Sequence, residues 1–256
     1  MLADTETTED AVLGGRLALR QPRRGHRFGH DAILLAAAVD ARGGEIAVDL
    51  GAGVGTAGLA LAHRVPGLDV RLIEIDPALA ALARDNAVRN GLAGRVSVAE
   101  LDVATATSAD FIDKANLPPG TADHVLMNPP FNDVARQNAS PDPARRRAHV
   151  ADGDTLPAWV KCAAWLLRPH GTLTLIWRAA GLGDVLSALP GFGAIALVPI
   201  HPKPEAAAIR VIVKAVKGGA APLSLLPPLT LNDADGKPSA EAEAILRGGA
   251  TIPVQP

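Results

Sequence analysis

One stretch decides the fold of this chain, and it reads Val48-Asp49-Leu50-Gly51-Ala52-Gly53-Val54-Gly55-Thr56. The residues Glu45-Ile46-Ala47 lead into it and, with Val48, predict a short and mainly apolar strand, and the small and apolar residues 57–62 after it predict a helix. A strand, a glycine-rich turn and a helix in that order open an α/β nucleotide-binding unit. The glycines let the backbone turn sharply and approach a ligand closely, because a Cβ atom would collide there. A purely structural turn has the same local sequence, so the stretch alone leaves the ligand open.

The spacing of the glycines separates two cofactors. A dinucleotide fingerprint has glycines at the first, third and sixth positions, which seat a pyrophosphate on the helix N-terminus. Here the sixth position, counted from Gly51, is Thr56, and the pattern G-x-G-x-G suits a ligand without phosphate, such as S-adenosylmethionine. The acids after the second predicted strand, Glu74 and Asp76, suit the ribose hydroxyls of either cofactor. The loop therefore favours the methyl donor without excluding the dinucleotide.

A second stretch carries the chemistry. The residues 122–127 predict a strand that runs into Asn128-Pro129-Pro130-Phe131. The exocyclic amine of adenine, like a carboxamide nitrogen, is a poor nucleophile because its lone pair is delocalised. The Asn128 side-chain oxygen and the Pro129 carbonyl can accept the amine hydrogens and free that lone pair for attack on a sulfonium methyl, while Pro130 stiffens the backbone. Phe131 offers a face for a flipped-out base. The alternative is a proline-stiffened loop.

Together these residues resemble the class I methyltransferases that modify planar amines. Two further segments narrow the resemblance, GHRFGHDAILLA at 25–36 and the late residues 199–204 with 210–214. Both are similar to the bacterial tRNA1(Val) adenine-37 N6-methyltransferases, and the resemblance covers roughly residues 12–217. It implies an α/β, Rossmann-like fold with a seven-stranded, mostly parallel sheet and a C-terminal antiparallel hairpin. It also implies S-adenosylmethionine as cofactor and tRNA as partner. His30 departs from the Thr or Ser expected before Asp31.

The motifs and the resemblance assign three groups of site residues. The catalytic residues are expected to be Asn128, Pro129, Pro130 and Phe131. The cofactor-binding residues are expected to be Asp31, Asp49, Gly51, Gly53, Gly55, Glu74, Asp76, Asp102, Val103 and Asn128. For Asp102, capping of a turn is an equal alternative to contact with the cofactor's adenine amine.

The substrate-binding residues come from two basic clusters and are expected to be Arg23, Arg24, Arg27, Arg145, Arg146 and Arg147. Either cluster alone would be read as solvated surface. One cluster lies in the acid-free residues 11–30 and the other follows the catalytic tetrapeptide, so together they indicate a phosphate-binding rim.

Composition bounds the remaining possibilities. The net charge of −2 argues against a globally basic nucleic-acid binder but allows local patches. Hydrophobic residues make up 48% of the 256 residues, enough for a sizeable core, which Ala, Leu and Val must fill because aromatics are scarce. The single cysteine, Cys162, excludes an internal disulfide, fits a cytoplasmic protein and is expected to be a buried filler. No membrane span, signal peptide or metal site is expected.

The chain is expected to divide into three segments. These are an N-terminal segment 1–42 with a short strand and a helix, a methyltransferase core 43–217, and a C-terminal linker with a short helix 218–256. Residues 1–10 are expected to be frayed, 129–153 to form a long loop and 169–171 a turn. Strands are predicted at 16–20, 45–50, 69–75, 95–101, 122–128, 172–177, 193–199 and 207–216. Helices are predicted at 31–41, 56–64, 77–90, 154–167, 181–189 and 239–247.

Three other functions compete with a tRNA methyltransferase. A protein glutamine methyltransferase uses the same logic on a carboxamide, usually with Tyr after the prolines and with a separate N-terminal helical domain. About 44 residues precede the first core strand, which is too few for such a domain. A ribosomal RNA guanine-amine methyltransferase lies between the two. A non-catalytic RNA-binding module is the third, and the intact tetrapeptide at Asn128 counts against it.

Overall fold

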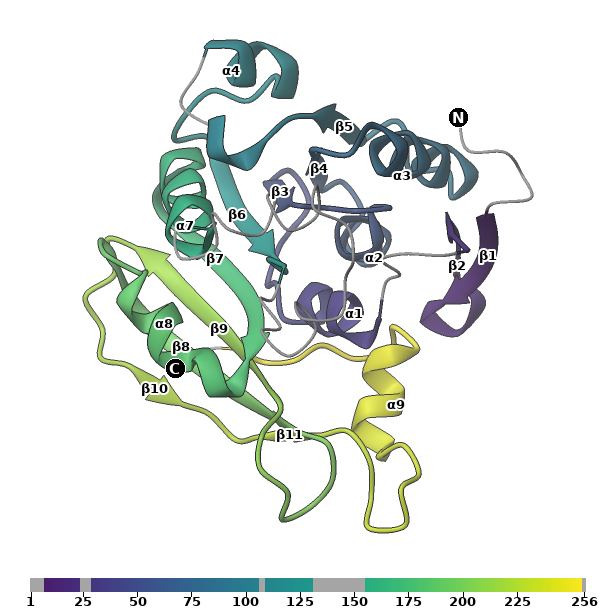
Figure 1. Ribbon diagram of the computed structural model, residues 1–256, viewed down its shortest axis with the longest axis vertical. Helices are drawn as coiled ribbons and strands as arrows, with labels where there is room; N and C mark the ends of the chain where they lie inside the picture. The colour runs from purple at the N-terminus through teal and green to yellow at the C-terminus, as the bar shows by residue number, and fades with distance from the viewer. Residues whose placement is uncertain (1–6, 24–28, 106–108, 131–154, 255–256) are drawn as a thin grey trace, which may run out of the picture.

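The computed structural model describes residues 7–23, 29–105, 109–130 and 155–254. Its main sheet has nine strands, of which seven are long: β3 (Ile46–Leu50), β4 (Asp69–Glu74), β5 (Val96–Glu100), β6 (Ala122–Met127), β7 (Leu167–Arg178), β8 (Phe192–His201) and β9 (Arg210–Lys217). Two short strands, β10 (Ser224–Leu225) and β11 (Leu229–Thr230), pair with β8. The order is β10-β8-β9-β7-β6-β3-β4-β5 (Figure 1). The predicted α/β class is confirmed, since β3 to β7 are parallel and β9 is antiparallel to both neighbours.

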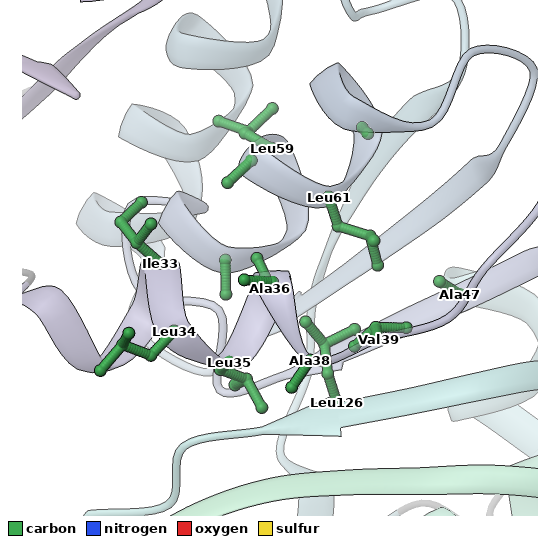
Figure 2. Close-up of a cluster of buried hydrophobic side chains, with 14 of the residues drawn as sticks. Ile33, Leu34, Leu35, Ala36, Ala38, Val39, Ala47, Leu59, Leu61 and Leu126 are labelled. Carbon is green, nitrogen blue, oxygen red and sulfur yellow. The ribbon is translucent and has the colours of Figure 1, made fainter. Parts of the chain in front are cut away.

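Helices cover both faces of this sheet. On one face, the core contains residues of α1 (His30–Ala37), α2 (Thr56–Arg64) and α3 (Pro77–Arg89). On the other face it contains residues of α4 (Ala109–Ala115), α7 (Thr155–Leu166) and α8 (Leu182–Ser187). Parallel strands covered on both faces are apolar almost throughout, as β3 is. Figure 2 shows the first of these cores, where side chains of α1 and α2 meet Ala47 and Leu126 of the sheet.

The strand order places a reversal beside β3. The chain runs from β3 to β4 and β5 on one side, and then returns to β6 on the other side of β3. In open α/β sheets, ligands bind beyond the carboxyl ends of the strands at such a reversal. The predicted bounds of these strands and of α2 agree with the structure to within about two residues.

The prediction that residues 1–10 are frayed is wrong for residues 7–10. They belong to β1 (Thr7–Val12), which forms an antiparallel hairpin with β2 (Leu17–Pro22) across the 3₁₀ turn η2 (Leu13–Gly15). This hairpin is attached to α3, because Ala18 and Arg20 donate their backbone N–H groups to the side-chain oxygens of Asn90 (3.0 Å) and Asn86 (2.7 Å). The polar residues of β1 are ordered because they pair with β2, which α3 holds in place, and because Glu9 forms an ion pair with Arg89 of α3.

Two other local predictions need correction. Asp31 is not the N-cap of the first helix, since α1 begins at His30 with Gly29 at the cap. Residues 169–171 do not form the predicted turn ahead of a strand. They lie within β7, which already begins at Leu167. The pairing of β6 with β7 shifts register between Ala122 and His124, and His170 has a φ of 63°, so an irregularity within the strand replaces the predicted turn.

The C-terminal residues return to the main body. Helix α9 (Ala240–Leu246) agrees with the predicted helix 239–247, and the Ser239 hydroxyl caps its N-terminus. It lies beside α1 (Figure 1). Ile252 then donates its N–H to the carbonyl of Ala37 at 2.9 Å. The predicted linker thus contains β10 and β11, while the division into segments 1–42, 43–217 and 218–256 stays a prediction. From residue 131 on, the predicted loop 129–153 lies outside the described residues.

Candidate active site

Two predicted motifs meet at the carboxyl edge of the sheet. Leu50 ends β3 and is paired with Met127, which ends β6. Gly51 and Asn128 are the next residues of these two adjacent strands, so the glycine loop and the tetrapeptide leave the sheet side by side. Both lie at the reversal of strand order, where a ligand is expected.

The glycine loop has a backbone that other residues adopt only with strain. Gly51, Gly53 and Gly55 have φ values of 68°, 58° and 89°. At Gly51 space is lacking as well, since a Cβ atom would lie 2.2 Å from Cη2 of Trp159 on α7. At Gly53 nothing lies within 4 Å of the Cβ position, so its glycine is required by backbone conformation alone.

The two buried acids of the site hold this loop. Glu74 accepts the Gly53 N–H with Oε2 at 2.7 Å and the Asp76 N–H with Oε1 at 2.9 Å. Asp49 accepts the Gly58 N–H of α2 at 2.8 Å. Burial raises the pKa of Asp49 to about 7, an effect that the Gly58 N–H opposes and the charge of Glu74 reinforces. Glu74 therefore holds the loop, and Asp49 holds the first turn of α2, before any ligand arrives.

The other predicted cofactor residues of this side have local structural roles. Asp76 caps α3 by accepting the N–H groups of Ala78 (2.8 Å) and Leu79 (3.3 Å). Asp102 accepts the Ala104 N–H at 2.9 Å at the 3₁₀ turn η3 (Val103–Thr105), which is the capping alternative foreseen for it. Val103 is buried in the core beneath α7. Their contact with a cofactor stays a prediction.

Asn128 differs from these acids. Its side-chain oxygen is buried, yet among the residues that the structure describes it accepts no hydrogen bond. Pro129 is buried and Pro130 is exposed. Buried polar atoms are nearly always paired, so an unpaired amide oxygen at a reversal of strand order indicates a place for a donor from outside the chain. Phe131 lies outside the described residues.

Of the remaining predicted site residues, the structure describes only Asp31 and Arg23. Asp31 forms an ion pair with Arg210, whose Nε lies 2.8 Å from the Asp31 Oδ2 atom. No hydrogen bond among the described residues joins Asp31 to the glycine loop. Arg23 is exposed at the end of the β1–β2 hairpin. The other predicted substrate-binding residues lie outside the described ranges: Arg24, Arg27, Arg145, Arg146 and Arg147.

Sequence reasoning missed two residues of the site. Trp159 packs its ring on Gly51, and Ile75, between Glu74 and Asp76, is 61% exposed although it is large and apolar. The scarcity of aromatics could have drawn attention to Trp159, and an isolated apolar residue between two acids to Ile75. Cys162, as predicted, is a buried filler of α7, and burial raises its pKa to about 12.

In the part of the chain that the structure describes, no group of three His, Cys, Asp or Glu side chains could hold a metal ion. None of the helices in that part is long and apolar enough to cross a membrane.

The order of the strands and the edge at Gly51 and Asn128 are those of the class I methyltransferases. The chain belongs to the methyltransferase small domain family, whose model matches residues 27–189. A solved structure from Agrobacterium tumefaciens, described as a predicted O-methyltransferase, is 29% identical and aligns with 87% of this chain and 98% of its own at a TM-score of 0.72.

Sequence relatives agree with the resemblance found from the motifs. A tRNA1(Val) (adenine(37)-N6)-methyltransferase from Porphyromonas gingivalis is 33% identical over 62% of this chain and 61% of its own length. A release factor glutamine methyltransferase from Moorella thermoacetica is 35% identical over 50% of this chain and 44% of its own. The predicted resemblance is thus confirmed, and the chain spans about three fifths of the length of the tRNA1(Val) methyltransferases that it matches.

Proposed function

We propose that this protein transfers a methyl group from S-adenosylmethionine to the exocyclic N6 amine of an adenine in tRNA. The observation that carries the proposal is the buried, unpaired side-chain oxygen of Asn128 at the end of β6, next to the glycine loop of β3. An amine hydrogen is the kind of donor that this oxygen lacks. A reaction in the cytoplasm, where tRNA is found, follows from this substrate.

The residues of the neighbouring loop fit the cofactor. A backbone with three left-handed glycines has no side chains to keep a ligand away, and Glu74 is fixed at the same place by two N–H groups. Glu74 would hold the ribose hydroxyls with its remaining lone pairs, and the exposed Ile75 would lie against the adenine. S-adenosylmethionine, when bound there, supplies a methyl group on a positively charged sulfur.

The chain's own contribution to the chemistry is to prepare the amine nitrogen. By accepting an amine hydrogen, the Asn128 oxygen draws the nitrogen from planar toward tetrahedral geometry, and its lone pair becomes available to the methyl carbon. The C–S bond breaks as the N–C bond forms, and the sulfur keeps the electron pair. The nitrogen then releases its proton to solvent, so no strong base is needed. Pro129, which is buried, and Pro130 stiffen the backbone next to Asn128 and so keep the Asn128 oxygen in place without reorganisation.

Glutamine in a protein is the second candidate substrate. The Moorella relative acts on a release factor by its name, and a carboxamide nitrogen would donate to Asn128 in the same way. Two features favour the adenine. Phe rather than Tyr follows the prolines, and the tRNA1(Val) methyltransferase from Porphyromonas gingivalis matches 62% of this chain, against 50% for the Moorella relative.

One experiment separates these substrates. The protein is incubated with tritiated S-adenosylmethionine and, in separate reactions, with total tRNA, ribosomal RNA or release factor. Digestion of labelled tRNA to nucleosides should give N6-methyladenosine. Label in release factor alone would replace adenine by glutamine, and label in ribosomal RNA as N2-methylguanosine would replace tRNA.

A further inference from the structure

Two asparagines of α3 take the place of a neighbouring strand along the edge of β2 that β1 does not cover. Asn86 accepts the Arg20 N–H with Oδ1 at 2.7 Å and donates Nδ2 to the Arg20 carbonyl at 3.0 Å. Asn90 pairs in the same way with Ala18, at 3.0 Å and 2.9 Å. Residues four apart on a helix are spaced much like residues two apart on a strand, so the two side chains pair with alternate residues of β2.

The two asparagines differ in where their second amide hydrogen goes. Asn86 donates it to the carbonyl of Val54 in the glycine loop, at 3.0 Å. Asn90 donates it back to its own helix, to the carbonyl of Asn86 at 2.7 Å. Asn86 is 0% exposed, although asparagine is mostly a surface residue, and both of its N–H donors are used. Asn86 therefore joins three segments of the chain: the hairpin, α3 and the glycine loop.

The Asn86 bond fixes one peptide of the glycine loop. In the peptide between Val54 and Gly55, the carbonyl accepts Asn86, and the N–H is donated to the carbonyl of Ala52 at 2.8 Å. Gly55, with a φ of 89°, is the N-cap residue of α2. Glu74 of β4 holds the loop one residue earlier. The loop thus has one anchor in the main sheet and a second in the helix that carries the hairpin.

The hairpin also leads to a predicted substrate contact. It forms a two-stranded sheet of its own, separate from the main sheet. β2 ends at Pro22, and the exposed Arg23, predicted to bind substrate, follows it. The residue that Asn86 grips, Arg20, lies three positions before Arg23. A short and continuous chain of hydrogen bonds, from β2 through Asn86 to Val54, therefore connects this end of the hairpin with the cofactor loop.

We propose that Asn86 is a positioning residue that couples the hairpin to the glycine loop, so that tRNA at the hairpin and S-adenosylmethionine in the loop strengthen each other's binding. The coupling rests on the proposed function, because it takes tRNA as the ligand of the hairpin. Each ligand restricts the segment that it contacts, and Asn86 passes part of this restriction on, so the second ligand loses less conformational entropy. The effect is reciprocal, because both equilibria share one coupling free energy.

The first measurement needs no RNA and gives the affinity of the full, folded chain for S-adenosylhomocysteine by calorimetry. Asn86→Ala should weaken binding about fivefold, the effect of one lost hydrogen bond. Asn90→Ala is the matched control, because it removes the same two bonds to β2 and none to the glycine loop. Its affinity should stay within about twofold of the parent's. Equal losses in the two variants, or no loss in Asn86→Ala, would overturn the role of Asn86.

The second measurement repeats the titration with saturating tRNA. The affinity of the parent for S-adenosylhomocysteine should rise at least about fivefold and that of Asn90→Ala nearly as much, whereas Asn86→Ala should gain less than about twofold. A merely structural role of Asn86 would lower the affinity without removing this gain. A parent that methylates tRNA but gains no affinity would overturn the coupling and leave the proposed function. A parent that labels no tRNA would overturn both.

Hydrogen exchange in the parent decides if Asn86→Ala does not fold. S-adenosylhomocysteine should slow exchange of the Arg20 N–H, which Asn86 accepts, more than exchange of the Ala18 N–H, which Asn90 accepts. Both amides lie on the same edge of β2, so their comparison removes the general stabilisation of a protein by its ligand. Equal slowing of the two amides would overturn the coupling.

Discussion

The carboxyl edge has a cofactor side, the glycine loop with Asp49 and Glu74, and an acceptor side at Asn128. The two carboxyl groups of the first and the amide oxygen of the second differ in how far they are paired. On the cofactor side, Glu74 accepts two backbone N–H groups and Asp49 accepts one. On the acceptor side, the buried oxygen of Asn128 has no partner among the described residues. An unmade hydrogen bond at a buried group costs about 1–3 kcal/mol. The two carboxyl groups of the cofactor side are therefore paired before any ligand binds, whereas under the proposed function the Asn128 oxygen would take its donor from the substrate.

The largest effect is expected from a change in the glycine loop on the cofactor side. Gly51→Ala places a methyl group 2.2 Å from the Trp159 ring and forces a non-glycine residue to a φ of 68°. The backbone strain costs about 1–2 kcal/mol and the overpacking a further 1–3 kcal/mol, roughly. Urea unfolding should show a loss near the sum of the two, and calorimetry should show weaker binding of S-adenosylhomocysteine.

Gly53→Ala is the control for the strain alone, because its Cβ position is open while its φ is 58°. It should lose only the smaller amount of stability. In a Trp159→Ala background, Gly51→Ala should then cost about as little as Gly53→Ala does. Equal losses for the two glycines in the parent background would contradict a steric role of Trp159.

The second change acts on the acceptor side. Asn128→Ala removes the unpaired acceptor, and single-turnover methylation at saturating cofactor and RNA should fall at least about a hundredfold, as when one preorganised polar group is removed from a transition state. Asn128→Asp keeps an oxygen at nearly the same place and should retain clearly more activity. Affinity for S-adenosylhomocysteine should change less than turnover in both variants. Parent-like turnover of the alanine variant would remove the central claim about the amine.

An aspartate variant as inactive as the alanine variant would have a different meaning. It would assign importance to the amide N–H₂ of Asn128, or to the extra negative charge near the sulfonium. Folding of both variants is checked by urea unfolding. Because the Asn128 oxygen has no partner to lose among the described residues, Asn128→Ala is expected to cost little stability.

How much of the carboxyl edge can be predicted from the sequence depends on how far apart in the chain the residues of each contact lie. The bounds of β3 and α2 follow from local apolar patterns and glycines, and the adjacency of Gly51 and Asn128 follows from parallel strands. The ion pair of Asp31 with Arg210 joins residues 179 positions apart, so no local pattern contains it. The contact of Trp159 with Gly51 and the attachment of the β1–β2 hairpin to α3 are of the same kind. The unpaired state of the Asn128 oxygen is likewise a property of packing.

The third change tests whether Glu74 serves the ligand as well as the loop. Glu74→Ala should weaken S-adenosylhomocysteine binding by about 1–3 kcal/mol, the range for a hydrogen bond to a charged group. The same variant leaves the N–H groups of Gly53 and Asp76 without their acceptor, so urea unfolding should detect a loss of stability without ligand. Glu74→Gln keeps one acceptor oxygen and should recover part of both. Ligand affinity equal to the parent's in Glu74→Ala would limit Glu74 to the loop.

The smallest effect concerns the pH dependence of stability, and it comes from Asp49 on the cofactor side. Burial is the main reason that the pKa of this carboxyl rises from 3.8 to about 7 in the fold. Between these values the folded protein keeps a proton that the unfolded chain has lost, so the stability contributed by Asp49 is complete below about pH 4 and is lost as the pH rises through 7. From pH 6 to pH 8 the loss should be about 1 kcal/mol.

Asp49→Asn stays neutral and can still accept the Gly58 N–H, so its unfolding free energy should lack this component of the fall. Because the charge of Glu74 contributes to the raised pKa, Glu74→Gln should move the fall to lower pH. A parent and an Asp49→Asn variant with parallel profiles from pH 5 to pH 8 would show that Asp49 is already ionised in the fold, and that the cofactor side holds two charges rather than one.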